Sequence, residues 1–132
     1  LVANAEILDT LKLYAEKLQK KIYREDLFSV QVETAIIQNL LSGKTDIETI
    51  SGQLAMSKRS LQIRLSKEGI KYKDILDKIK REHAIQLLEQ SRIAIIDITF
   101  LLGYSEQSAF NRAFKKWTGF TPGEYRQNYL SA

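Results

Sequence analysis

The chain has 132 residues, a length that suits one domain or two very small ones. Its hydrophobic share of 44% and charged share of 27% are typical of a globular protein, and the absence of cysteine excludes disulfides and thiolate metal sites. No apolar run approaches the ~20 residues of a membrane span and no signal peptide is visible, so we expect a cytoplasmic protein without membrane contact. Glycine and proline are scarce and apolar residues recur at helical spacing, which predicts an all-α fold.

The net charge of +4 is distributed unevenly along the chain. Residues 1–42 hold five Lys/Arg against six Asp/Glu, whereas residues 43–132 hold fifteen against ten. Phosphate binding requires such a basic excess, although mild basicity is also common in proteins that bind no nucleic acid.

The first predicted element is a helix from Asn4 to about Ile22, with a short linker at 24–29. Its apolar stripe comes close to a heptad pattern and comprises Ile7, Leu8, Leu11, Tyr14, Ala15, Leu18 and Ile22. The stripe either packs on the domain or meets a partner helix, so residues 1–28 are interpreted as the remnant of an upstream domain or as a dimer contact. Because the chain starts with leucine and not methionine, we expect it to be a piece of a longer protein.

A second helix is predicted from Val30 to Ser42, followed by a stop at Gly43. Its inward residues are predicted to be Val32, Ala35, Ile36, Leu40 and Leu41. Thr45 and Glu48 have the spacing of a capping box, which would open the next short helix.

Residues 46–69 predict a first helix-turn-helix. A tight turn at residues 55–57 leads into a helix from Lys58 to about Lys67, with Ser57 as its N-cap. Leu61 and Leu65 would face inward, and Gly69 would end the helix. One continuous helix over about 71–90 is then predicted, with a length of roughly 30 Å. That length is close to the ~34 Å between successive major-groove faces on one side of a duplex.

Residues 94–119 predict a second helix-turn-helix. Its first helix would bury Ile95, Ile98, Leu101 and Leu102, and Gly103 would turn the chain. Ser105 is the expected N-cap of the second helix, in which Phe110 and Phe114 face the core. The pattern matches that of residues 46–69, so the chain contains an internal repeat.

A closing helix over about 122–130 is predicted from Thr121, Pro122 and Glu124, which have the form of a capping box with proline at the first helical position. Tyr125 and Tyr129 are expected to pack inward, and Arg126 to point outward.

These residues resemble the AraC/XylS family of bacterial transcription regulators. The motifs that carry the resemblance are Gly103-Tyr104, Phe110-Asn111-Arg112-Ala113-Phe114-Lys115, Gly119-Phe120-Thr121-Pro122 and Tyr125-Arg126. The resemblance covers about residues 30–130. It implies a DNA-binding domain at 29–130 made of two helix-turn-helix subdomains joined by a long linker helix, here preceded by an extra N-terminal helix.

The resemblance also implies a function. It would be sequence-specific binding of double-stranded DNA by a nucleoid-associated regulator, an activator by family habit, with RNA polymerase as a further partner. The expected base contacts are Arg59, Gln62, Ile63, Gln107, Ser108, Asn111 and Arg112. The expected phosphate contacts are Ser57, Lys58, Ser66, Lys115 and Lys116. Ile63 and Ala55 depart from the family pattern, which usually has arginine and glycine there.

A different class of function stays open at this point, namely a helical protein-interaction module without intrinsic DNA specificity. An enzyme is not expected, because His83 is the single histidine and no catalytic set surrounds it. No cofactor or metal is expected, since the acidic pairs lack a metal-binding pattern.

Overall fold

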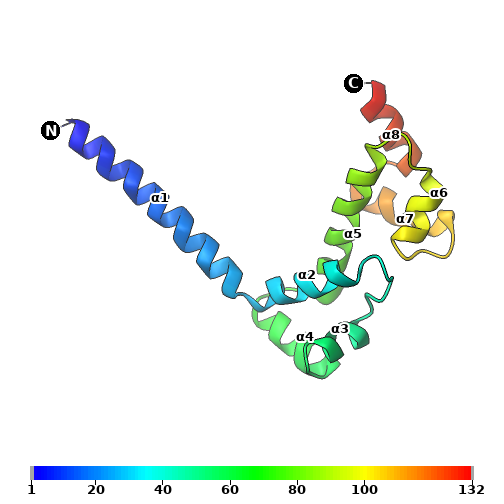
Figure 1. Ribbon diagram of the computed structural model, residues 1–132, viewed down its shortest axis with the longest axis horizontal. Coiled ribbons are helices and arrows are strands. Elements are labelled where there is room, and N and C mark those ends of the chain that lie inside the picture. The colour runs from blue at the N-terminus through cyan, green and yellow to red at the C-terminus, as the bar shows by residue number, and fades with distance from the viewer. Residues whose placement is uncertain (1, 132) are drawn as a thin grey trace.

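A computed structural model describes the backbone of residues 2–131 and the side chains of residues 5–18 and 27–131 (Figure 1). The regular elements of this part of the chain are helices, which confirms the all-α prediction. They are α1 (Val2–Asp26), α2 (Phe28–Asn39), α3 (Ile47–Gln53), α4 (Lys58–Lys67), α5 (Tyr72–Leu88), α6 (Ile95–Leu101), α7 (Gln107–Thr118) and α8 (Pro122–Ser131). None of the helices in the described residues has both the length and the apolar content that crossing a membrane requires.

Helix α5 joins two separate hydrophobic cores. Ile75 and Ile79, near its start, pack into a cluster with buried residues of α2, α3 and α4. Ala84 and Leu88, near its end, pack into a second cluster with buried residues of α6 and α7. The structure therefore has two helix-turn-helix subdomains on one shared helix, as the sequence predicted. With 17 residues, α5 is about 25 Å long and so somewhat shorter than the predicted 71–90.

The first subdomain is held together by side chains that are distant in sequence. The Glu68 carboxylate accepts hydrogen bonds from the backbone N–H groups of Phe28 (2.9 Å) and Ser29 (3.2 Å) at the start of α2. The Arg64 guanidinium lies 4.1 Å from the centroid of the Phe28 ring. The end of α4 thus caps α2 and fixes its start, and this pairing has no local signal in the sequence.

The boundaries of the first two helices differ from those predicted. Helix α1 runs to Asp26, so the linker shrinks to Leu27, and α2 begins at Phe28 and ends at Asn39. Leu41 was predicted to face inward but is 82% exposed, because the helix has already given way to a turn there. The predicted place of Ile22 in the apolar stripe of this helix lies outside the described side chains.

Two of the predicted caps are wrong. At α3 the capping residue is Asp46 and not Thr45, since the Asp46 carboxylate accepts from the Thr49 backbone N–H (3.0 Å). At α7 the N-cap residue is Glu106 and not Ser105, and its side chain makes no capping hydrogen bond. In both cases the helix starts one residue later than the first available hydroxyl suggested.

In the second subdomain an aromatic cluster surrounds α7. Phe110 and Phe114 are fully buried, as predicted, and their ring centroids are 5.8 Å apart. Tyr104 stacks on Phe110 at 5.6 Å, and Tyr125 of α8 meets Phe114 edge-on at 5.6 Å. Such pairs add to the free energy gained from burial. Ile98 and Leu102 are buried too, whereas Leu101 is 40% exposed, contrary to the prediction.

Helix α8 begins with the predicted capping box. The Glu124 backbone N–H donates to Thr121 Oγ1 (3.1 Å), and the Thr121 N–H donates to Glu124 Oε1 (3.0 Å). The outward placement of Arg126 is wrong, because its guanidinium donates to the carbonyl oxygens of Leu88 (2.9 Å) and Gln90 (3.1 Å). Arg126 therefore satisfies the open carbonyl end of α5. Tyr129 was predicted to pack inward but is 47% exposed.

Helix α1 extends away from the two subdomains as a separate rod (Figure 1). Its large apolar side chains are exposed, and they are Ile7, Leu8, Leu11, Leu13, Tyr14 and Leu18. The predicted stripe is thus exposed over its described part, residues 7–18, and the other described residues do not cover it.

Candidate nucleic-acid interface

The exposed face of α4 carries the residues predicted to contact DNA from the first subdomain. Leu61 and Leu65 are buried on the opposite face, so the helix is fixed against the core. The exposed residues are Ser57, Lys58, Arg59, Gln62, Ile63 and Ser66. Ile63 is 45% exposed, which leaves an apolar side chain in the middle of a polar surface. Such a side chain can contact a thymine methyl group.

Three of the residues predicted to contact phosphates already have protein partners. Ser57 accepts from the Ser60 backbone N–H (3.1 Å), as predicted for the N-cap, and donates to Ser60 Oγ (3.0 Å). Ser66 Oγ donates to the Ile63 carbonyl (2.8 Å), and Lys58 Nζ lies 3.3 Å from Glu48 Oε1. A phosphate would have to replace these interactions, and the exposed ion pair is weak enough in water to be exchanged.

Helix α7 presents the corresponding surface of the second subdomain. Ser108, Arg112, Lys115 and Lys116 are exposed, while Gln107 and Asn111 are half-buried at the edge. Phe110 and Phe114 hold the opposite side of the helix in the core. The predicted site residues of this helix thus form one polar and basic row. Their side chains can donate to the bases and phosphates of a major groove.

Glu106 is a residue of this surface that sequence reasoning missed. It precedes α7, and its Oε2 accepts a hydrogen bond from Ser108 Oγ (2.9 Å). A carboxylate in this place can accept from the amino group of cytosine but repels phosphate. The signal in the sequence is the position of Glu106, two residues before Ser108 and directly before the predicted contact residue Gln107.

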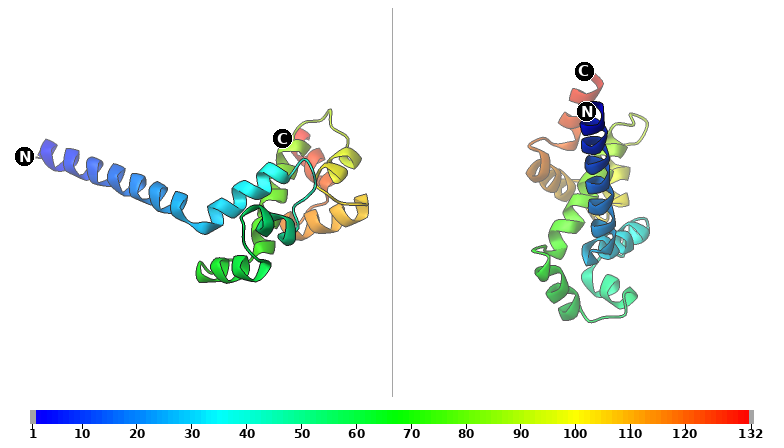
Figure 2. Two further views of the ribbon diagram at one scale, coloured as in Figure 1. Left: turned by 60° about the horizontal axis from the view of Figure 1, so that its bottom comes forward. Right: turned by 90° about the vertical axis from the view of Figure 1, so that its left-hand side faces the viewer.

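Helices α4 and α7 lie on the same side of α5. In the right view of Figure 2 both are on the left of the molecule, while α3 and α6 are on the right. In the left view both lie along the lower edge of the two subdomains. The two helices that carry the polar residues therefore lie on one side of α5.

The turn of the second subdomain is attached to α5 by a lysine. Lys80 Nζ lies 4.8 Å from the centroid of the Tyr104 ring, in the geometry of a cation–π contact. Burial lowers the pKa of Lys80, and burial together with the nearby Asp77 charge raises the pKa of Tyr104 to about 12. At neutral pH the Tyr104 phenol therefore stays protonated.

The residues considered as chemical sites do not form one in the described part of the chain. No group of three or more His, Asp or Glu side chains there is arranged to hold a metal ion. His83 lies on α5 beside a hollow between α2 and α5.

Comparison with known proteins shows to which family this architecture belongs. A family model described as a helix-turn-helix domain matches residues 50–128, which is more than half of the chain. The chain belongs to the AraC-type family of helix-turn-helix regulators. The HTH-type transcriptional regulator VirS of Mycobacterium tuberculosis is 34% identical over 119 residues, which cover 89% of this chain. The chain spans only 35% of the length of VirS.

Solved structures agree with this AraC-type assignment. A DNA-binding transcriptional dual regulator from Escherichia coli K-12 superposes with a TM-score of 0.73 at 26% identity, covering 79% of this chain and 93% of that one. The C-terminal domain of AraT, a response regulator from Geobacillus stearothermophilus, gives a TM-score of 0.69 at 29% identity. It covers 76% of this chain and 84% of that domain.

Proposed function

We propose that this domain binds double-stranded DNA with sequence specificity, with α4 and α7 in successive major grooves on one face of the duplex. The observation that carries the proposal is the position of these two helices on the same side of α5 (Figure 2). Family membership supports it, because AraC-type proteins are DNA-binding transcription regulators. The domain would belong to a bacterial regulator, an activator, that works in the cytoplasm at the nucleoid.

In this proposal the two helices divide the reading of the bases between them. Arg59, Gln62 and Ile63 would contact bases in one groove, and Gln107, Ser108, Asn111 and Arg112 in the next. Arginine pairs with guanine through two hydrogen bonds, and asparagine pairs with adenine in the same way. Phosphates would be held by Ser57, Lys58, Ser66, Lys115 and Lys116, which makes affinity fall steeply with salt.

The proposal is tested by selecting bound duplexes from a random pool. A bipartite motif with half-sites about one helical turn apart is expected, since each half-site would be read by one helix. A motif confined to one half-site would contradict the simultaneous use of α4 and α7. Indifference to all duplexes at low salt would instead favour a protein-interaction module.

Arg112→Ala tests the base contact of α7. We expect a loss of about 1–3 kcal/mol on the selected duplex and relaxed discrimination at one base step. Lys116→Ala serves as the control, because loss of a phosphate contact should weaken selected and scrambled duplexes alike. If Arg112→Ala discriminates between duplexes as well as the wild type, Arg112 does not read a base.

The exposed stripe of α1 favours a second feature of the function, a homodimer. Ile7, Leu11, Tyr14 and Leu18 follow one another at spacings of four, three and four residues, as the core positions of a coiled coil do. All four side chains are exposed in the single chain. Two copies could bury this stripe against each other, and an upstream domain is the other candidate that could cover it.

RNA polymerase is a further partner in this proposal, on the ground of the family resemblance.

A further inference from the structure

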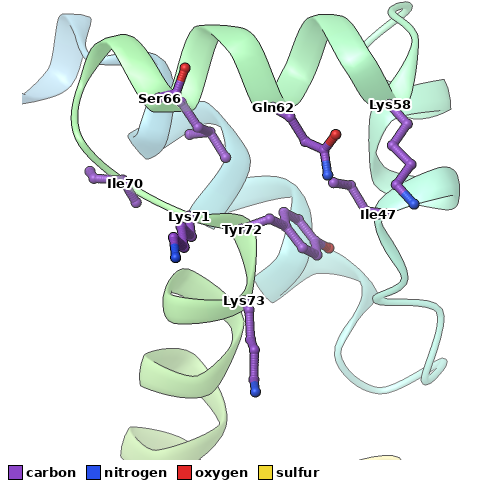
Figure 3. A pocket seen from close by; sticks show the side chains of 9 residues that line it. Ile47, Lys58, Gln62, Ser66, Ile70, Lys71, Tyr72 and Lys73 are labelled. Atoms are coloured by element: carbon purple, nitrogen blue, oxygen red, sulfur yellow. The ribbon is translucent and has the colours of Figure 1, made fainter.

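A hollow of about 430 Å³ lies beside the exposed face of α4 that is proposed to contact DNA, between α3, α4 and the start of α5 (Figure 3). Its floor is apolar and includes Leu65, Ile70 and the ring of Tyr72. One wall consists of Gln62 and Ser66, which belong to the row of α4 residues proposed to face DNA. The hollow therefore borders the surface that would enter the major groove.

The opposite side of the hollow is formed by two lysines at the start of α5. Lys71 and Lys73 flank Tyr72 on the α5 side of the hollow, and Lys58 and Gln62 lie on the α4 side; the Lys73 side chain extends along α5, away from α4 (Figure 3). Both lysines are exposed, and within the described residues neither belongs to an ion pair. Lys58 differs from them, since it is paired with Glu48.

Tyr72 fixes the position of the two lysines. Its hydroxyl donates a hydrogen bond to the Thr45 carbonyl, which ties the start of α5 to the loop before α3. Burial, reinforced by the charges of Asp46 and Glu48, raises the pKa of Tyr72, so the phenol keeps its proton at neutral pH. The first turn of α5 is therefore tied to the loop before α3.

The charges around the hollow are arranged in two sectors. The acidic residues Asp46 and Glu48 lie at the start of α3. There the Asp46 carboxylate accepts hydrogen bonds from Thr49, and the Glu48 carboxylate forms an ion pair with Lys58. The α5 side carries the ammonium groups of Lys71 and Lys73 together with the exposed carboxylate of Asp74 in the same turn, so its net charge is positive. An anionic chain that follows the α5 side therefore meets an excess of positive charge.

We propose that this hollow holds the sugar–phosphate backbone of one DNA strand, with Lys71 and Lys73 binding consecutive phosphates. The inference rests on the proposed entry of α4 into the major groove, because a helix in that groove has a phosphate strand along each side. The hollow lies along one of these sides. Lys71 and Lys73 thus anchor the first subdomain, as Lys115 and Lys116 would anchor the second.

The test compares the 132-residue chain with its Lys71→Ala/Lys73→Ala variant on two duplexes, the one selected from the random pool and a scrambled version. The dissociation constant is measured over a series of salt concentrations. We expect weaker binding to both duplexes by the same factor, and a slope of log K against log salt that is shallower by about 0.9 for each lost phosphate contact. The discrimination between the two duplexes should stay unchanged.

The matched control is Lys12→Ala/Lys17→Ala, which removes the same charge from the exposed surface of α1. It should leave the salt slope at the wild-type value. An unchanged slope in the Lys71→Ala/Lys73→Ala variant, or an equal change in the control, would overturn the inference. These outcomes are distinct from a failure of the proposed function, in which the wild-type chain itself would not distinguish the two duplexes.

Tyr72→Phe provides a second measurement, because it removes the hydrogen bond that positions the lysines but leaves every charge in place. We expect a partial decrease of the salt slope with retained helical circular dichroism. A wild-type slope in Tyr72→Phe together with a reduced slope in the lysine variant would show that the lysines act without this positioning.

Discussion

Among the single residues, Ala55 has the most unusual backbone. It is the one non-glycine residue with positive φ in the described part of the chain, at 57°. The corresponding turn of the second subdomain has Gly103, with φ of 89°. Left-handed backbone costs an L-residue roughly 1–2 kcal/mol, whereas glycine adopts it freely. The first helix-turn-helix therefore has a strained turn immediately before α4.

Ala55→Gly is expected to stabilise the fold. The gain should be about 0.5–1 kcal/mol, because the relief of strain exceeds the extra entropy that glycine loses on folding. Urea unfolding monitored by circular dichroism measures the change. Gly103→Ala is the reciprocal control and should destabilise by about 1 kcal/mol, since no atom would crowd the new Cβ and the cost is purely conformational. A loss of stability in Ala55→Gly would show that the turn is not strained.

At the level of helices, acidic side chains hold two helix starts. Asp46 accepts from Thr49 at α3, and Glu124 exchanges hydrogen bonds with Thr121 at α8. The Thr49 hydroxyl and backbone N–H lower the pKa of Asp46, and the Thr121 backbone N–H followed by its hydroxyl lower the pKa of Glu124. Each carboxylate therefore favours the folded state in its ionised form.

These two caps predict a pH dependence of stability. Because the pKa of each group is lower in the folded than in the unfolded protein, the stabilisation is complete above the unfolded pKa. It is lost as pH falls through the folded pKa, in the acid range below about pH 4. The Asp46→Asn/Glu124→Gln variant should lose less stability than the wild type between pH 7 and pH 3 in urea unfolding. Parallel stability curves for the two proteins would contradict the assignment.

At the scale of the whole molecule, the two subdomains differ from α1 in how far their apolar side chains are covered. Each subdomain buries its own hydrophobic core against α5, so other described residues cover its apolar side chains. Helix α1 instead exposes a row of large apolar side chains that contact little within the chain. Exposed contiguous apolar surface of this kind usually marks an interaction site.

The coiled-coil interpretation predicts that the chain self-associates through α1. Leu11→Lys should raise the dimer dissociation constant on the order of tenfold or more, because a buried leucine contributes about 1.5–3 kcal/mol. Sedimentation equilibrium measures this. Leu13→Lys is the matched control, since Leu13 is equally exposed but does not belong to the row of Ile7, Leu11, Tyr14 and Leu18. If the wild-type chain stays monomeric, the self-association is contradicted, and an upstream domain becomes the candidate that packs on the apolar side chains of α1.

Local signals in the sequence predicted the helices and most of their buried residues. The spacing of Phe110 and Phe114 predicted the core face of α7, and Ser57 and the Thr121–Glu124 pair predicted two of the caps. These features depend on residues within one or two turns of each other. Periodicity and capping are properties of such short segments, so the amino-acid order determined them.

Features that depend on contacts between distant segments were decided by the packing of the helices. Arg126 was expected to face solvent, but the end of α5 offers it open carbonyl groups across 38 residues of sequence. Glu68 caps α2 from 40 residues away, and the Tyr72 hydroxyl donates a hydrogen bond to the Thr45 carbonyl, which ties the start of α5 to the loop before α3. A local pattern shows which residues share a helix face, but the neighbour that covers this face depends on the path of the whole chain.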